Sequence, residues 1–334
     1  MDRFIEDKVE VIVDQMNKYG KQRVPFLFGF DFELENGFFS SSPDECKHLL
    51  FKVPGYSNFK LECKKSELKC SSALEIENFI SRGDYQKKFE KVMNGISRGD
   101  SYLLNLTLKT PIQLNISFDN IFTYSDSMYS VLFKNRFVCF SPERFVKIEN
   151  GYIFSNPMKG TMSAEIENAL NILSSDYKEN CEHNTIVDLI RNDIGIISES
   201  VSVPKFKYID RIKTSYGDIY QMSSEVMGKL KQGYEDNLGN LIFSLLPAGS
   251  VSGAPKKSTI RIIKDSEGEK RGYYTGIFGY YDGFSLDSCV LIRYIEAIED
   301  KFFYRSGGGI TINSDLDMER EEAFSKIYLP FKDN

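Results

Sequence analysis

A carboxyl group and an amine are brought together by a predicted β-hairpin in the middle of the chain. Asn150 and Gly151 form a two-residue turn signal between two apolar segments. Regular pairing outward from this turn places Glu143 opposite position 158, next to Lys159. An acid beside an amine suits acid–base or nucleophilic chemistry. Taken alone, the pair is better explained as a surface ion pair worth under about 1 kcal/mol, and Pro157 disturbs regular strand pairing.

A second predicted hairpin brings an arginine to a run of glycines. It joins a strand containing Arg293 to Arg305–Ile310 across a turn near Glu299–Asp300, so that Arg293 faces residues 306–308. Glycine inside a strand costs conformational entropy, which indicates that a ligand or another chain segment closely approaches Gly307–Gly309. Free amides and a forked guanidinium suit a carboxylate. A simple β-bulge explains the glycines equally well.

Two predicted helices carry acids on one face each. Glu179 and Glu182 are three residues apart, on the side that continues into apolar residues. Glu319 and Glu322 share a face with Lys326. Charged helix faces are usually exposed to solvent, which is the simpler explanation of each pair. If the four carboxylates converge, an all-oxygen site of this kind suits Mg²⁺.

These residues must be positioned by a mixture of strands and helices. Alternating apolar residues and turn signals predict strands near residues 24–32, 37–40, 102–108, 129–134, 136–148, 152–156, 218–230, 273–281, 289–298 and 301–312. Helices are predicted between the repeated Ile-Ser-Arg-Gly-Asp segments at 80–84 and 96–100, and near 165–174, 179–195, 235–245, 255–265 and 315–328. The irregular order of hairpins and helices predicts an α+β protein with mostly antiparallel sheets.

The composition excludes several classes of protein. The 334 residues include 42 Lys and Arg and 48 Asp and Glu, mixed along the chain, for a net charge of −6. This balance is unlike that of nucleic-acid or polybasic membrane binders. No apolar stretch approaches the roughly 18 residues that cross a bilayer, and the first residues are acidic where a signal peptide is basic. The six cysteines show no CxxC spacing and fit cytosolic thiols. We therefore expect a cytoplasmic protein.

Several segments together resemble the chorismate-utilising enzymes, the family of anthranilate, aminodeoxychorismate, isochorismate and salicylate synthases. The resemblance runs from about residue 80 to 332, and its most specific parts are Glu182–Gly195, Pro247–Lys256, Arg271–Gly276 and Gly307–Lys326. It implies a fold of two large, mostly antiparallel β-sheets packed across one another with helices outside. Residues 1–78 would be a short segment that completes this single domain, and residues 79–334 its catalytic core.

Three positions indicate the branch of the family. Isochorismate and salicylate synthases carry a water-activating lysine at the place that Leu103 occupies here. Anthranilate synthases have alanine where this chain has Lys159, whereas aminodeoxychorismate synthases typically have lysine in this Pro-x-Lys-Gly-Thr motif. Gln221 replaces a histidine that is linked to pyruvate elimination in the anthranilate enzymes. The chain is thus most similar to component I of the aminodeoxychorismate synthases.

The resemblance implies covalent catalysis. The Lys159 amine would add at C2 of chorismate while Glu143 protonates the departing C4 hydroxyl, and ammonia would then add at C4 and expel the lysine. Mg²⁺ bound to the ring carboxylate would be held by Glu179, Glu182, Glu319 and Glu322. The remaining substrate-binding residues would be Arg293, Tyr274, Gly307 and Gly309 at the enolpyruvyl carboxylate, with Ser250, Thr161 and Lys326 completing the pocket.

Two other functions remain open, an anthranilate synthase component I and a non-catalytic chorismate-binding subunit. The retained Lys159, Glu143 and four carboxylates argue against the second. The chain has only two histidines, His48 and His183, and neither has the sequence context of an amidotransferase triad. We therefore expect a separate glutamine amidotransferase subunit to supply the ammonia, with no role for nucleic acid or membrane.

Overall fold

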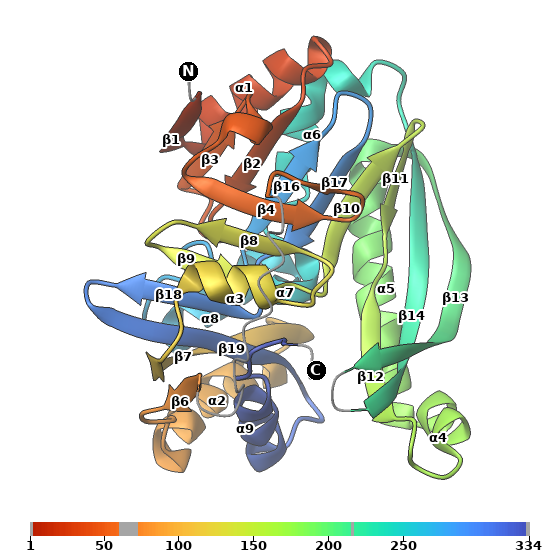
Figure 1. Cartoon of the computed structure of the whole chain (residues 1–334). Coiled ribbons are helices and arrows are strands. Elements are labelled where there is room, and N and C mark those ends of the chain that lie inside the picture. Colours follow the sequence, from red (N-terminus) through yellow and green to blue (C-terminus); the bar gives the residue numbers. More distant parts are fainter. Residues whose placement is uncertain (1–2, 60–72, 215–216, 332–334) are drawn as a thin grey trace.

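Two β-sheets pack against one another in the computed structural model, which describes residues 3–59, 73–214 and 217–331. Strands form the middle of the molecule and helices lie outside them (Figure 1). Neighbouring strands pair antiparallel throughout the described ranges. The α+β prediction is therefore confirmed.

The first sheet draws its strands from both ends of the chain. Their order is β1 (Phe4–Lys8), β3 (Asn36–Ser40), β2 (Phe26–Phe30), β16 (Ile277–Tyr281), β17 (Leu286–Val290), β10 (Arg144–Glu149), β11 (Tyr152–Ser155), β14 (Gly217–Leu230) and β12 (Met158–Ser163), and β13 (Ser198–Thr214) also pairs with β14. Because β2 pairs with β16, the N-terminal segment is built into the sheet that carries later parts of the chain.

The second sheet contains the glycine run. Its order is β15 (Gly253–Ala254), β7 (Leu103–Leu114), β19 (Lys301–Thr311), β18 (Tyr294–Ile298), β9 (Phe137–Cys139), β8 (Ser130–Phe133), β4 (Leu49–Val53) and β5 (Tyr56–Ser57), and β6 (Leu74–Ile76) also pairs with β7. β7 and β19 form its longest continuous ladder, from Leu103 opposite Thr311 to Ile112 opposite Phe302.

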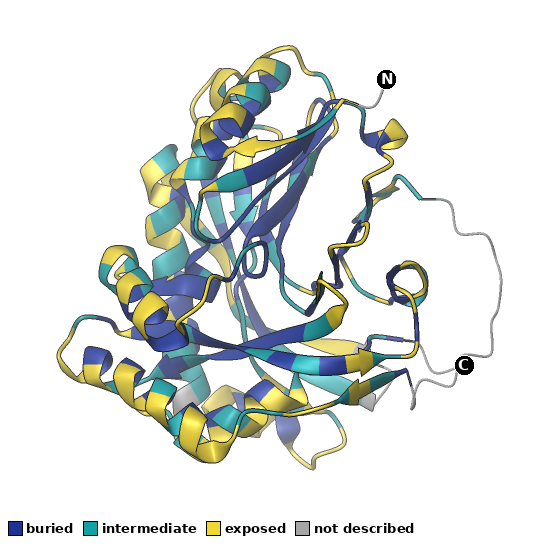
Figure 2. Ribbon diagram, turned by 90° about the vertical axis from the view of Figure 1, so that its left-hand side faces the viewer, coloured by how far each residue is buried: buried dark blue, intermediate teal, exposed yellow. Residues whose placement is uncertain are grey.

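Helices cover the outer faces of the two sheets. They are α1 (Val9–Lys21), α2 (Arg82–Ser97), α3 (Phe118–Tyr124), α4 (Ala169–Ser175), α5 (Tyr177–Ile197), α6 (Leu238–Ser244), α7 (Gly249–Ser252), α8 (Lys256–Glu267) and α9 (Leu316–Ser325), with 3₁₀ turns at Pro43–Glu45 and Tyr234–Asn237. α1, α5 and α6 pack on the first sheet, and α2, α8 and α9 on the second. Figure 2 shows buried strands flanked by helices with exposed outer sides.

An aromatic core holds the two sheets together. Phe38 and Phe278 from the first sheet meet Phe51 and Phe137 from the second, and each of these rings is at most 1% exposed. Burying a large apolar side chain contributes about 1.5–3 kcal/mol. No helix in the described ranges combines the length and apolar character needed to span a bilayer.

Two predicted strands are in fact pairs of strands that belong to different sheets. The segment predicted as one strand over 136–148 divides into β9 and β10, and that over 289–298 divides into β17 and β18. Glu143 lies at the first crossing and Arg293 at the second. Arg293 has a φ of 52°, in the left-handed region, so the strand cannot continue through it. The prediction of single strands joined the apolar residues on the two sides of each crossing, although Ser141–Arg144 interrupts them at the first.

Other predicted elements differ in extent. The strand β13 was not predicted, because its many polar residues hide the alternation. The predicted helix over 165–174 begins only at Ala169, and the last helix ends at Ser325 rather than 328. The helix between the two repeats is confirmed as α2: the Ser81 side chain accepts a hydrogen bond from the Asp84 amide at its start.

Candidate active site

The two crossings between the sheets lie side by side and are tied by backbone hydrogen bonds. The Phe140 amide donates to the Arg293 carbonyl at 3.0 Å, and the Val290 amide donates to the Glu143 carbonyl at 3.2 Å. Residues from the two predicted hairpins thus come together because each chain segment changes sheet at the same place. This corner positions a carboxyl group and a guanidinium around one cavity.

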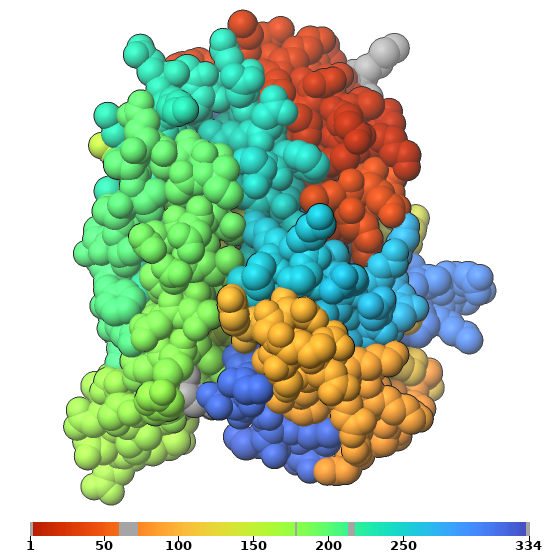
Figure 3. All heavy atoms as spheres, turned by 180° about the vertical axis from the view of Figure 1, so that it is seen from behind, coloured from red at the N-terminus to blue at the C-terminus, as the bar shows by residue number. Residues whose placement is uncertain are grey.

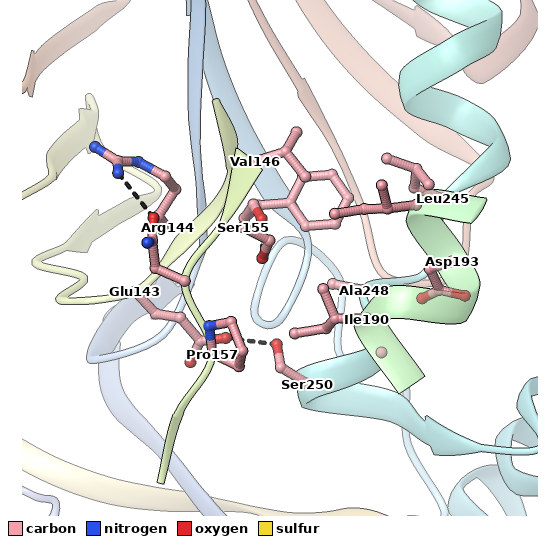
Figure 4. Close-up of a pocket in the computed structure, with 14 residues that line it drawn as sticks. Glu143, Arg144, Val146, Ser155, Pro157, Ile190, Asp193, Leu245, Ala248 and Ser250 are labelled. Atoms are coloured by element: carbon pink, nitrogen blue, oxygen red, sulfur yellow. Dashed lines mark hydrogen bonds between the residues drawn. The ribbon is translucent and has the colours of Figure 1, made fainter. Parts of the chain in front are cut away.

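Glu143 is held by a serine from a short helix. The Ser250 hydroxyl on α7 donates to Glu143 Oε1 at 2.5 Å, and Figure 4 shows this hydrogen bond at the edge of a neighbouring pocket that both residues also line. Burial raises the pKa of the Glu143 carboxyl, while the Ser250 hydrogen bond and the nearby cations of Lys159 and Arg293 partly oppose the shift. A carboxyl group with a raised pKa can donate a proton at a higher pH than an exposed glutamate can.

Lys159 lines the same cavity, but from β12, which pairs with β14 and not with the strand of Glu143. The hairpin pairs as predicted, with Glu149 opposite Tyr152, but the predicted extension to Glu143 and position 158 does not form. Pro157 separates β11 from β12, and β12 pairs with β14 instead. The prediction of strand pairing was therefore wrong at this point, although Glu143 and Lys159 do line one cavity.

The cavity encloses about 260 Å³ and gathers every residue predicted to be catalytic or substrate-binding. These are Glu143, Lys159, Thr161, Ser250, Tyr274, Arg293, Gly307, Gly309 and Lys326. They come from both sheets, from α7 and from the chain just after α9. The structure thus places them together, while their roles remain predictions.

Cations and a tyrosine line one side of this cavity. Lys326 Nζ donates to the Gly307 carbonyl at 2.8 Å, and Arg293 Nε donates to the Tyr328 hydroxyl at 3.2 Å. Burial lowers the pKa of Lys326 and raises that of Tyr274 to about 12, which keeps the phenol protonated and able to donate. This side is suited to binding a carboxylate.

The glycine run is approached closely by the neighbouring strand β7 and by Lys159. A β-carbon added to Gly307 would lie 2.4 Å from the Leu106 carbonyl oxygen, which no real side chain tolerates. A β-carbon on Gly309 would lie 3.3 Å from Lys159 Nζ. The predicted close approach is therefore confirmed, and it involves the amine of the proposed nucleophile.

The four predicted metal ligands line a second, adjoining cavity of about 430 Å³. Glu179 and Glu182 come from α5, and Glu319 and Glu322 come from α9. Figure 3 shows a hollow between the yellow-green surface that contains α4 and the dark blue surface of α9. Lys159 also lines this cavity, and its Nζ lies 3.9 Å from Glu182 Oε2. The two cavities therefore share the amine.

The carboxylates approach one another without forming a compact cluster. Glu319 Oε2 and Glu322 Oε1 each lie 3.5 Å from where a β-carbon on Gly308 would be, and Glu319 Oε1 accepts a hydrogen bond from Ser314. Within residues 3–59, 73–214 and 217–331, no three His, Cys, Asp or Glu side chains are arranged to hold a metal ion. All four side chains offer oxygen donors, and this chemistry fits Mg²⁺.

The cavity also contains polar residues to which the sequence assigned no role. Asn105 on β7 and Gln221 on β14 line the cavity that contains Glu143, and Tyr328, which follows the observed end of α9 at Ser325, lines the carboxylate cavity. The sequence carried a signal for Asn105, since it is a polar residue in the centre of an otherwise apolar segment from Leu103 to Leu108. No comparable signal marked Tyr328, because its place depends on how the chain turns after α9.

Comparison with known proteins connects this site to a family. Residues 36–331 match the model of the chorismate binding enzymes. The chain is 43% identical over 328 residues, 98% of both chains, to a Haemophilus influenzae protein named "Uncharacterized PabA-like protein".

Two better-described relatives are more distant. The chain is 33% identical to anthranilate synthase component 1 of Acetivibrio thermocellus, matching 77% of this chain and 54% of the relative. It is 30% identical to aminodeoxychorismate synthase component 1 of Bacillus subtilis, matching 78% of this chain and 58% of the relative. The chain thus spans only part of the length of either synthase.

The architecture agrees with a solved structure. A crystal structure of a putative 2,3-dihydroxybenzoate-specific isochorismate synthase from Bacillus anthracis superimposes with a TM-score of 0.73 over 97% of this chain and 89% of the other, at 19% identity. At that identity the agreement concerns the fold alone, and it confirms the predicted pair of large sheets with helices outside.

Proposed function

This chain belongs to the family of chorismate binding enzymes, and from that premise we propose that it aminates chorismate at C4 to give 4-amino-4-deoxychorismate, a step toward p-aminobenzoate and folate. The observation that carries this proposal is the placement of Lys159 and Glu143 around one cavity that also holds Arg293, Tyr274 and Lys326. An amine, an acid and a set of carboxylate-binding groups are what covalent substitution on a chorismate dianion requires.

The proposed reaction has two substitutions. In the first, the neutral Lys159 amine forms a bond to C2 of chorismate, both ring double bonds shift by one position, and the C4–oxygen bond breaks. Glu143 gives its proton to the departing hydroxyl, which leaves as water. In the second, ammonia bonds to C4, both double bonds shift back and the bond between C2 and Lys159 breaks. The surplus proton on the new nitrogen returns to Glu143, so that the net change replaces hydroxyl by amine.

The charges around the cavity support this sequence of steps. The raised pKa of Glu143 keeps its proton available for the leaving group. The guanidinium of Arg293 and the phenol of Tyr274 would bind the enolpyruvyl carboxylate with the amides of Gly307 and Gly309. Ser250 orients Glu143, and Thr161 and Lys326 complete the pocket wall.

We include Mg²⁺ in the proposal, held by Glu179, Glu182, Glu319 and Glu322. A bound cation would supply positive charge for the ring carboxylate among side chains that otherwise repel it. The residues of the chain would do the rest: α5 and α9 present their carboxylates from opposite sides of the cavity, and Lys159 lies between this cavity and Glu143.

The ammonia would come from a separate glutamine amidotransferase subunit. His183 is fully buried, its Nε2 lies 2.7 Å from the Ser224 hydroxyl, and burial lowers its pKa to about 4. The ring of His48 stacks on Phe4. These contacts differ from those of a base that activates a cysteine. Cys63 and Cys70 lie outside the described residues. The free thiols Cys46, Cys139, Cys181 and Cys289 fit the proposed cytoplasmic location.

An anthranilate synthase activity is the second candidate, favoured by the 33% identity to such an enzyme. Aminodeoxychorismate formation keeps the enolpyruvyl group, whereas anthranilate formation releases pyruvate. Lys159 and Gln221 favour the first, because the resemblance to the family gives alanine and histidine at these places in anthranilate enzymes.

One assay separates the candidates. The purified chain is incubated with chorismate, Mg²⁺ and ammonium, and the products are identified by mass. The proposal predicts 4-amino-4-deoxychorismate with no release of pyruvate. Anthranilate with an equal amount of pyruvate would establish the second candidate instead, and unchanged chorismate bound to the chain would indicate a non-catalytic binding subunit.

A further inference from the structure

The active-site cavity contains a hydrogen-bond acceptor that the proposed mechanism leaves unused. Asn105 lies on β7, directly opposite Gly309 on β19, and lines the cavity together with Lys159. Its side-chain oxygen Oδ1 is buried and has no hydrogen-bond partner within the described part of the chain. Leaving a buried acceptor unpaired costs about 1–3 kcal/mol, so such an oxygen in an active site calls for an explanation.

The sheet register places this carboxamide close to the proposed nucleophile. Side chains of directly opposed residues project from the same face of a sheet, with β-carbons about 4.5–5.5 Å apart. A β-carbon on Gly309 would lie 3.3 Å from Lys159 Nζ and 3.2 Å from the side chain of Leu103, two residues before Asn105 on β7. Lys159 Nζ and the Asn105 side chain therefore occupy the same side of β7 and β19, within the length of one small molecule.

The backbone at Asn105 is fixed. The carbonyl of Asn105 accepts a hydrogen bond from Arg271 Nη2 at 2.6 Å. Arg271 is 1% exposed and is itself paired with Glu267 at 2.7 Å. This buried network holds the backbone of β7 in place at Asn105, so its side chain starts from a fixed position in the sheet.

The chemistry of the acceptor selects its ligand. Asn105 is uncharged, and the cations of Arg293 and Lys326 line the same cavity. A cation such as ammonium is repelled by these charges, whereas neutral ammonia is not. Only neutral ammonia has the lone pair that attacks carbon, and each of its N–H bonds needs an acceptor once it leaves water.

We propose that Asn105 Oδ1 holds the incoming ammonia by accepting a hydrogen bond from one of its N–H groups, so that its lone pair can reach C4 of the ring while Lys159 is bound at C2. This inference rests on the proposed amination of chorismate and deepens it by naming the residue that binds the second substrate. Asn105 is then an ammonia-binding residue, separate from the groups that bind chorismate.

The test compares three variants in steady-state assays with ammonium as the varied substrate. Asn105→Leu removes the acceptor with little change in size, Asn105→Asp keeps an acceptor oxygen, and Asn120→Leu is a matched control on the exposed surface of α3. We expect Asn105→Leu to raise the KM for ammonium by about tenfold, since one hydrogen bond is lost. The KM for chorismate should change by less than about threefold in the same variant.

Asn105→Asp should keep the KM for ammonium within about threefold of the original, and Asn120→Leu should match the original chain in both constants. A fall in kcat with an unchanged KM for ammonium in Asn105→Leu would overturn the proposal, because it would assign Asn105 to the placement of Lys159. A tenfold rise in the KM for chorismate would likewise overturn it.

Failure of the proposed function would look different. If the unaltered chain forms no aminated product from chorismate and ammonium, the proposed function is wrong whatever the variants do. If the unaltered chain forms the product and Asn105→Leu uses ammonium equally well, only the role of Asn105 is wrong. A folded state of each variant is checked by circular dichroism, which should match that of the original chain.

Discussion

The two halves of the candidate site are organised in different ways. Around Glu143, the protein supplies its own partners: Ser250 donates to the carboxyl group, and backbone hydrogen bonds join the two sheet crossings. Around Glu182 and Glu322, carboxylates from two helices share one cavity with the amines of Lys159 and Lys326, and Lys326 Nζ lies 2.7 Å from Glu322 Oε1. The first half is ordered by hydrogen bonds within the fold, whereas in the proposed function the second would be completed by a bound cation.

Lys159 links the two halves, because it lines both cavities. The chemistry of the two halves is therefore connected through one amine. Changes in the first half should alter the substitution steps and their pH dependence, and changes in the second should alter the requirement for Mg²⁺. The predictions below test this division in order of decreasing effect.

Replacing Lys159 should have the largest effect. Lys159→Ala removes the proposed nucleophile but no core side chain, so we expect kcat to fall by at least about a thousandfold while circular dichroism stays unchanged. Lys229→Ala is a matched control, since Lys229 is 57% exposed and pairs with Glu199 at the surface. Formation of product by a folded Lys159→Ala chain at the original rate would refute covalent catalysis.

Loss of the metal should come next. Treatment with a chelator is expected to abolish activity, and added Mg²⁺ should restore it. Glu182→Gln or Glu322→Gln should raise the Mg²⁺ concentration for half-maximal rate by at least about tenfold, because a charged ligand becomes neutral.

The neighbouring exposed Glu321 on α9 offers a matched control. Glu321→Gln should leave the Mg²⁺ requirement unchanged, since this side chain lies outside the carboxylate cavity. Full activity after chelation, or an equal effect of all three substitutions, would remove the basis for the proposed metal site.

Removing the hydroxyl of Ser250 should change the pH profile more than the maximal rate. Glu143 must be protonated to act as an acid, so kcat/KM falls as pH rises through its pKa. The Ser250 hydrogen bond favours the ionised carboxylate, and Ser250→Ala should therefore move the alkaline limb upward by about one pH unit. A downward shift would contradict the assignment of Glu143 as the acid.

The smallest effect is expected at Gly308. A β-carbon there would meet the carboxylates of Glu319 and Glu322 at 3.5 Å, an ordinary contact distance. Gly308→Ala should fold normally and raise the Mg²⁺ requirement by less than about threefold. Gly307→Ala, by contrast, would force a β-carbon against a carbonyl oxygen of β7 at 2.4 Å and should lower the melting temperature. Equal melting temperatures of the two variants would contradict the claim that β7 leaves no room for a β-carbon at Gly307.

The sequence predicted much of the site because several of its segments carry local signals. The Asn150-Gly151 turn fixed one hairpin correctly, and the spacing of Glu179 with Glu182 and of Glu319 with Glu322 placed each pair on one helix face. That the two pairs line one cavity did not follow from spacing and was implied only by the resemblance to the family. The two sheet crossings were not predicted, although Ser141–Arg144 interrupts the apolar residues at the first, because such an interruption does not show that the chain changes sheet. The place where a chain passes from one sheet to the other depends on how the sheets pack, as at Arg293, whose backbone is left-handed. Local periodicity of apolar residues carries no information about that packing.

The unpaired acceptor of Asn105 shows the same limit. Its polar side chain within an apolar strand was visible in the sequence, but its position opposite Gly309 depends on the register between β7 and β19. That register joins segments about two hundred residues apart. A polar residue in a buried strand can therefore be assigned to a site only once the strand that pairs with it is known.

The most direct test of the account is the mass of the protein during a single turnover. The chain is mixed with chorismate and Mg²⁺ without ammonia, quenched rapidly and digested. The account predicts that the peptide containing Lys159 gains the mass of chorismate minus water, and that adding ammonium before the quench removes this mass and releases 4-amino-4-deoxychorismate. Product formation from ammonium with no adduct at any time, or an adduct on a peptide that lacks Lys159, would contradict it.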